Sequence, residues 1–129
     1  MNVARGFLVI GPLYLIAGVL IGIYMGASDD HTLAPAHAHI NLLGFAVMML
    51  FGMAYWLIPA AGTSRLAQVH FWLHQVGALV LAVLLVLLFS GRLTEAQMVP
   101  LAPLAELAIL VGVLCFAWNM FRHAHPPQG

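Results

Sequence analysis

The sequence predicts an all-α membrane protein in which four helices cross the bilayer. Hydrophobic residues make up 64% of its 129 positions and charged residues only 6%, with no lysine. A soluble domain carries charges at about a quarter of its positions, so these few cannot cover a surface that faces water. The lipid bilayer is therefore the predicted surroundings of most of the chain. A net charge of zero, without a basic run, excludes nucleic acid as a partner.

Four apolar runs account for the helices in order along the chain. One span needs about 20 mostly apolar residues, so the length allows four spans joined by short connectors. The first run ends without an Ala-x-Ala pattern, which favours a retained helix over a cleaved signal peptide. Connectors that contain glycine, proline or serine separate the runs. The predicted spans are 7–25, 36–58, 69–89 and 99–121.

The arginines predict the orientation of these helices. Arg5, Arg65 and Arg122 fall on one side of the predicted bundle, whereas Arg92 falls on the other side with the acidic connector residues. Because positively charged loops stay in the cytoplasm, both termini are expected there. The expected location is the inner membrane of a bacterium.

His37 and His39, near the start of the second span, are the first candidate ligands. Successive residues of an α-helix turn by about 100°, so these imidazoles point about 200° apart and cannot hold one ion together. They can serve two neighbours on opposite sides of the helix. In the alternative interpretation, both bind water or lipid phosphate at the headgroup level.

The two sides of the second span differ in character. Glycines on the His37 side allow close approach of another helix or of a flat ligand. The His39 side is apolar enough to wall a macrocycle. The His37 side continues through Asn41, Gly44, Met48, Gly52 and Tyr55, and the His39 side through Leu42, Leu43, Ala46, Leu50 and Leu57.

His70 and His74 form a second pair, four residues apart and so on one face of the third span. Such a pair suits Zn²⁺ or Cu²⁺ if further ligands join it. Alternatively, Gln68 and Gln75 are their hydrogen-bond partners, or the segment is an aromatic anchor at the membrane interface. At about 1.5 Å per residue, His39 lies roughly 30 Å and His74 roughly 12 Å from the inner side, which predicts two separate sites.

Glu106 is the one carboxylate expected within a span, about eight residues into the fourth helix. Ionisable residues at such depth are costly and often functional. Glu106 is expected to carry protons or to accept the free N–H of a ligand histidine. The alternative is a protonated side chain hydrogen-bonded to a neighbouring helix. His123 and His125 follow the fourth span and are expected to be solvated.

Two motifs in the second span, His39-Ile40-Asn41-Leu42-Leu43-Gly44 and Phe51-Gly52-Met53-Ala54-Tyr55-Trp56-Leu57-Ile58-Pro59, carry a family resemblance. This span resembles the second helix of the catalytic subunit of haem-copper oxidases, above all of nitric oxide reductases and cbb3-type oxidases. The resemblance covers about a fifth of the chain. It implies that His39 is a haem ligand. His37-Ala38-His39 is also similar to the His-x-His of a later helix in the family, whose histidines bind two haems.

The family subunit has twelve helices in three similar arcs of four, so this chain resembles one arc. A homotrimer is therefore expected, because cyclic closure rebuilds the full architecture. His37 of one protomer then faces His39 of the next across a haem.

These expectations combine into one leading function and two alternatives. The leading one is a membrane protein with haem b, in electron transfer or in redox chemistry of NO or O₂, and so a candidate oxidoreductase. Its electrons come from a quinol or a cytochrome, and copper is a further candidate cofactor. The alternatives are a copper- or zinc-binding protein and a non-catalytic assembly partner of a respiratory complex. The haem site comprises His37, His39, Asn41, Gly44 and Tyr55, with Glu106 beside it, and the alternative metal site comprises Asp29, Asp30, His31 and His37.

Overall fold

A computed structural model describes residues 1–124 and shows four long helices, with no strand in this part of the chain. His125, one of the two histidines expected to be solvated, lies outside the described residues. All four helices are long and apolar enough to cross a membrane, so the chain is a multi-pass, all-α membrane protein. Each predicted span coincides with one helix, and no end differs by more than four residues. The four are α1 (Val3–Ser28), the combined helix Ala34–Leu57, α5 (Arg65–Phe89) and α6 (Leu101–His123).

The second membrane helix, Ala34–Leu57, has three parts. It begins as α2 (Ala34–His39), continues as the π-helical segment η1 (Ile40–Ala46) and ends as α3 (Val47–Leu57). Two short elements lie in the connections: α4 (Pro59–Gly62) and the 3₁₀ turn η2 (Glu95–Met98).

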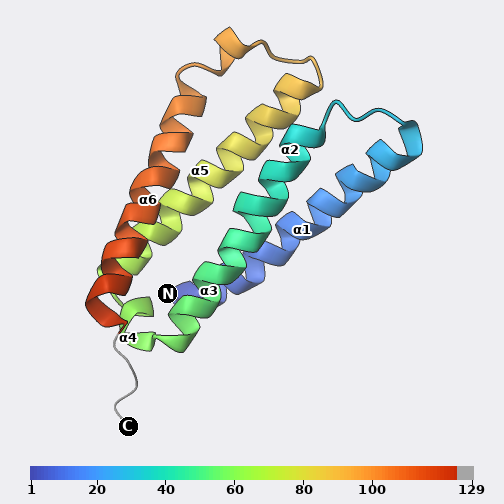
Figure 1. The fold of residues 1–129 in the computed structure, drawn as a ribbon. Helices are drawn as coiled ribbons and strands as arrows, with labels where there is room; N and C mark the ends of the chain where they lie inside the picture. The colour runs from blue at the N-terminus through green and yellow to red at the C-terminus, as the bar shows by residue number, and fades with distance from the viewer. Residues whose placement is uncertain (125–129) are drawn as a thin grey trace.

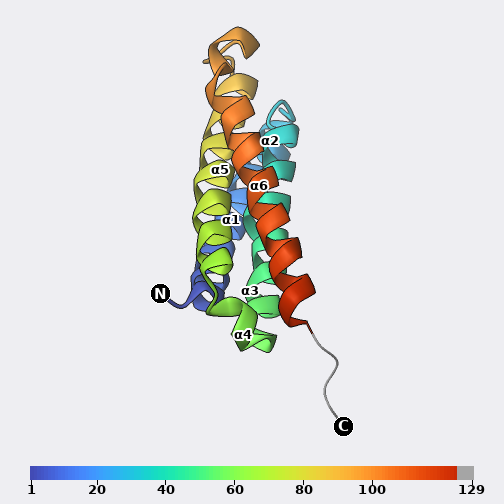
Figure 2. The same ribbon diagram turned by 90° about the vertical axis from the view of Figure 1, so that its left-hand side faces the viewer.

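The helices run side by side in alternating directions, as Figures 1 and 2 show. The N-terminus, α4 and the end of α6 lie at one end of the bundle, which we call the α4 end. The connection between α1 and α2 lies with η2 at the other end, the η2 end. Arg5, Arg65 and Arg122 therefore share the α4 end and Arg92 lies at the η2 end, as the sequence predicts.

Local sequence explains where several helices begin and end. The side chain of Asn2 caps α1 by accepting the backbone N–H of Arg5 at 3.0 Å. Ser64 caps α5 in the same way, accepting the N–H of Ala67 at 3.1 Å. Such caps satisfy backbone donors that have no partner within the helix. Asp29 ends α1 in the left-handed conformation, with a φ of 55°.

Aromatic rings fill the core of the bundle toward the α4 end. Phe7 of α1 lies at its centre, with ring centroids 5.7 Å from Phe51, 6.2 Å from Tyr55 and 5.0 Å from Phe71. These rings come from α1, α3 and α5, so one cluster joins three membrane helices. The remaining core residues are mostly small, which lets the helices approach closely. They include Val3, Ala4, Met48, Ala61, Ala67 and Ala78.

Glycines of the second helix allow α1 to pack against its His37 side. A Cβ atom at Gly44 would collide with the ring of Tyr14, and one at Gly52 would lie 2.8 Å from Cγ of Leu8. Both neighbours belong to α1. The glycines predicted to admit another helix thus do so, and the occupant is α1 of the same chain.

We predict that Gly44→Ala destabilises the bundle. The added methyl group meets the Tyr14 ring, and overpacking of this kind costs about 1–3 kcal/mol. Thermal unfolding in detergent, followed by circular dichroism, measures the effect. Gly26→Ala is the matched control, because a Cβ there meets nothing within 4 Å and alanine favours the helix by about 1 kcal/mol. Equal melting temperatures for the two variants would contradict the packing role of Gly44.

Candidate functional site

The π-helical segment sets the faces of the second helix. Buried residues recur at every fourth position, at Ala36, Ile40, Gly44 and Met48. In a regular α-helix, four residues overshoot one turn by about 40°, so such a row drifts around the helix. A π-turn bonds i to i+5, as the N–H of Val47 to the carbonyl of Leu42 shows. The wider turn keeps these four residues on the buried side.

His39 lies on the exposed side of this helix with one ring nitrogen already engaged. Its Nδ1 lies 2.8 Å from the carbonyl oxygen of Pro35. A carbonyl only accepts, so Nδ1 carries the hydrogen and Nε2 holds the free lone pair. Histidines that bind metals commonly donate their other N–H to a carbonyl in this way. The backbone thus holds His39 in the tautomer of a ligand.

A groove of about 380 Å³ runs beside His39, between the second helix, α5 and α6. Glu106 lines the same groove from α6. Of the two roles expected for Glu106, accepting a ligand histidine's N–H does not apply to His39, whose hydrogen goes to Pro35. Glu106 is instead an exposed carboxylate within a membrane helix, which is costly in contact with lipid. The other lining residues are Leu43, Leu81, Ile109, Leu110 and Val113.

His37 faces the opposite way, toward α1, as the spacing of about 200° predicts. Its Nδ1 donates to the carbonyl oxygen of Gly18 at 2.9 Å, and Nδ2 of Asn41 lies 3.1 Å from its Nε2. Gly22 lines this contact, because a Cβ there would lie 3.2 Å from Cε1 of His37. Both nitrogens of His37 therefore have partners within the chain. His37 and His39 do not share a site in one protomer.

The connection between α1 and α2 holds the residues of the alternative metal site. His31 Nδ1 lies 3.4 Å from the backbone carbonyl of Asp29. The carboxylate of Asp30 accepts the backbone N–H of Thr32 at 3.0 Å, and this bond lowers the pKa of Asp30. Within residues 1–124, no three histidine, cysteine or acidic side chains gather closely enough to hold a metal ion.

His70 and His74 lie in the core of the bundle and are fully buried. Nδ1 of His70 is 2.9 Å from the hydroxyl of Tyr55, and Nε2 of His74 donates to the carbonyl oxygen of Leu43 at 3.0 Å. Neither bonds to a neighbouring glutamine, since Gln75 donates to the sulfur of Met48. Both histidines are therefore core residues. They neither bond to the glutamines nor anchor the helix at the membrane interface, the two alternatives given in the sequence analysis.

Aromatic rings surround the two buried imidazoles. The ring centroids of His70 and His74 are 5.9 Å apart, and the rings of Phe7 and Phe51 contact both. Nε2 of His70 and Nδ1 of His74 have no hydrogen-bond partner among the described residues. An unsatisfied buried group of this kind costs about 1–3 kcal/mol. The pair offers two nitrogen ligands, half of what a structural zinc site needs.

The depth of His74 differs from the sequence-based estimate. Counting residues placed His39 and His74 about 18 Å apart along the membrane normal. The bond from His74 reaches Leu43, which follows His39 by four residues, or about 6 Å of helix rise. The count treated both helices as straight α-helices that start at one level. In the structure α4 lies between the end of α3 and the start of α5, so the two helices need not start at one level. The imidazole of His74 also adds its own length to the reach.

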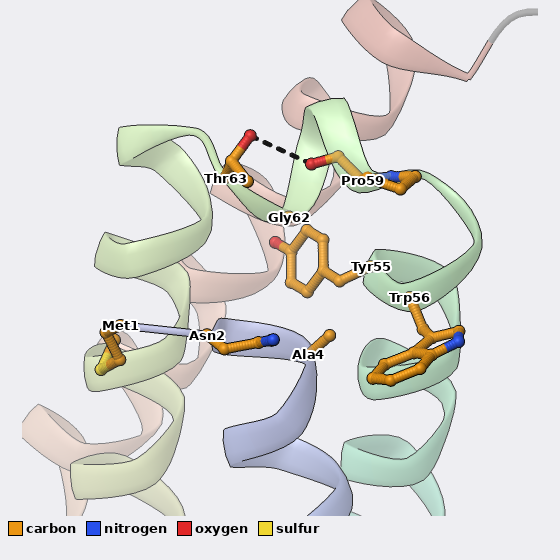
Figure 3. A pocket seen from close by; sticks show the side chains of 8 residues that line it. All are labelled: Met1, Asn2, Ala4, Tyr55, Trp56, Pro59, Gly62 and Thr63. Atoms are coloured by element: carbon orange, nitrogen blue, oxygen red, sulfur yellow. Dashed lines mark hydrogen bonds between the residues drawn. The ribbon is translucent and has the colours of Figure 1, made fainter.

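A pocket of about 400 Å³ opens at the α4 end, and Tyr55, itself buried, forms part of its wall. In Figure 3 the ring of Tyr55 lies between the first turn of α1 and α4. The family resemblance implies a place for Tyr55 beside a haem, whereas the structure places its hydroxyl on His70. The pocket is lined by Met1, Asn2, Ala4, Tyr55, Trp56, Pro59, Gly62 and Thr63.

Asn119 of α6 is a structural polar residue that the sequence analysis missed. It is fully buried, donates to the carbonyl oxygen of Ala61 at 3.0 Å and accepts from the hydroxyl of Ser64 at 3.1 Å. An asparagine within an apolar run was the available signal. Its backbone carbonyl also accepts Nδ1 of His123 at 2.9 Å, which ties down a side chain expected to be solvated.

Comparison of the chain with protein-family models, curated proteins and solved structures found no match. Its function is therefore inferred from its own residues. Two features offer ring nitrogens that could bind a metal or a cofactor. They are the outward imidazole of His39 beside its groove and the buried pair of His70 and His74.

Proposed function

We propose that the chain binds haem b through Nε2 of His39 and takes part in electron transfer or in redox chemistry of NO or O₂. The observation that carries this proposal is the bond from His39 Nδ1 to Pro35, because it leaves Nε2 free and oriented. The apolar groove beside His39 suits a macrocycle, and the resemblance of this helix to haem-copper oxidases agrees. When bound, the haem supplies the electron-accepting iron.

The groove also gives Glu106 a role in this proposal. Glu106 lines the same groove as His39, so its carboxylate would stabilise the more positive state of a haem held there. Glu106 then serves as a local counter-charge or proton acceptor. A quinol or a cytochrome is the proposed electron donor.

We predict that His39→Ala abolishes haem binding while the protein still inserts into the membrane. The substitution removes the only proposed ligand on the groove side, so the Soret band and the α-band of the reduced protein disappear. Absorption spectra of the purified variant measure this. His31→Ala is the control, because His31 lies in the exposed connection and its loss leaves the spectrum unchanged.

Two results would contradict the assignment. A His39→Ala variant with unchanged spectra would show that another residue holds the haem. Colourless wild-type protein with bound copper or zinc would support the metal-binding alternative, for which the unpartnered nitrogens of His70 and His74 are the supporting observation.

We further propose that the chain forms a homotrimer in which each haem lies between two copies. Among the histidines of residues 1–124, His39 alone lines the groove, and a haem with two histidine ligands would need a second imidazole from elsewhere. His37 of the neighbouring copy is the proposed second ligand. Its Nδ1 already donates to Gly18, as Nδ1 of His39 does to Pro35, but its Nε2 must give up the N–H of Asn41. Such a hydrogen bond contributes about 1 kcal/mol. A neighbouring copy also covers Glu106 and keeps it from lipid.

The trimer predicts one haem per chain and a mass of three chains in a gentle detergent. In His37→Ala the haem stays on His39 but becomes five-coordinate and high-spin, because the second ligand is lost. Mass photometry and absorption spectra measure the two quantities. A monomer with six-coordinate haem would refute ligation between copies. Unchanged spectra in His37→Ala would show that His37 is not a haem ligand and serves only in packing against α1.

The proposed location is the bacterial inner membrane, with the α4 end in the cytoplasm, because three of the four arginines lie there. We predict that a membrane-impermeant thiol reagent added outside labels Ser28→Cys and Thr94→Cys but not Thr63→Cys. All three positions are exposed, and Cys115→Ala removes the native thiol. The reverse labelling pattern would invert the topology.

A further inference from the structure

The bond between His74 and Leu43 joins the buried histidine pair to the helix that carries His39. Nε2 of His74, on α5, donates to the carbonyl oxygen of Leu43, which lies at the middle of the π-helical segment Ile40–Ala46. A side chain that bonds into the backbone ladder of a helix and a π-bulge are both known sites of irregularity in helices, and here the two coincide. No other residue on α5 makes a side-chain hydrogen bond to this segment within residues 1–124.

The π-turn has a direct effect on the direction of His39. A π-turn accommodates one residue more than the α-helix it interrupts. One extra residue rotates everything before it by about 100° relative to α3. Without that rotation, the buried row through Ala36 and Ile40 turns away from α1 and α5, and His39 leaves the groove it shares with Glu106.

We propose that His74 is a positioning residue: its N–H holds the π-turn open and thereby aims His39 into the groove. Within residues 1–124, His74 has no second polar contact that explains its presence, because its Nδ1 has no partner there. Its bond to Leu43 is therefore the one polar interaction that a substitution removes. The effect on haem rests on the proposed function, whereas the effect on helix rotation does not.

Two substitutions of His74 test this role. His74→Leu removes the donor, so the segment regains α-helical bonding and His39 turns away. His74→Gln keeps an N–H donor at similar reach but is a poor metal ligand and carries no titratable proton. We expect His74→Gln to retain the wild-type haem content and spectrum and His74→Leu to lose at least nine-tenths of its haem.

A spin label at position 38 reports rotation without haem. Ala38 is exposed, and its label, in a Cys115→Ala background, collides with dissolved oxygen in the bilayer. We expect His74→Leu to lower the collision rate at least twofold, because the label turns toward neighbouring helices. His74→Gln leaves the rate unchanged. If the label responds in this way while no variant, wild type included, binds haem, the positioning role stands and the haem proposal fails.

A deletion distinguishes a rotated helix from a His74→Leu chain that simply fails to fold. Removing Leu42, an exposed residue of the π segment, takes out the extra residue. In the His74→Leu background it restores a regular helix, with the residues before it in their original direction. We expect the oxygen collision rate of the label and the haem content to return to their wild-type values. An unchanged label rate in His74→Leu, a His74→Gln variant that behaves like His74→Leu, or no recovery on deletion would each overturn the proposal.

Discussion

A backbone carbonyl in the middle of a membrane must find a donor within the protein, because lipid offers none. In this chain such a donor comes from another helix at the π-helical segment of the second helix, where the imidazole of His74 donates to the carbonyl of Leu43. The wide turn brings Ala36, Ile40, Gly44 and Met48 onto one side. The packing of α1, the direction of His37 toward Gly18 and the exposure of His39 all depend on that alignment.

The polar residues of the bundle fall into two sets with different roles. The residues of one set form hydrogen bonds within the core: Asn119 bonds to Ala61 and Ser64, and Tyr55 bonds to His70. The other faces outward, where His39 and Glu106 line one groove. Polar groups that open onto lipid remain costly until something covers them. The outward set therefore marks the surface at which the proposed haem and the proposed neighbouring copy would bind.

The sequence predicted the helices because hydropathy alone identifies residues that need a bilayer. It also predicted opposite directions for His37 and His39, since two residues turn a helix by about 200° in any context. It did not predict the hydrogen-bond partners of His70 and His74, which come from other helices: Tyr55 from α3 and the carbonyl of Leu43. A backbone carbonyl carries no signature in the sequence, and neither does a π-turn. The depth of His74 was also estimated wrongly, because counting residues ignores where each helix starts and how far a side chain reaches. The haem and the trimer remain predictions.

The helices pack as two hairpins, α1 with the second helix and α5 with α6, and fewer contacts join the hairpins to each other. Neighbours in sequence can therefore enter the bilayer as pairs, each pair burying its own contacts before the two meet. His74 and Leu43 belong to different hairpins, so their bond forms only on docking. The first hairpin alone lacks the donor that accompanies its π-turn. On the proposed role of His74, the imidazole of His39 acquires its final direction only after the last two helices are in place.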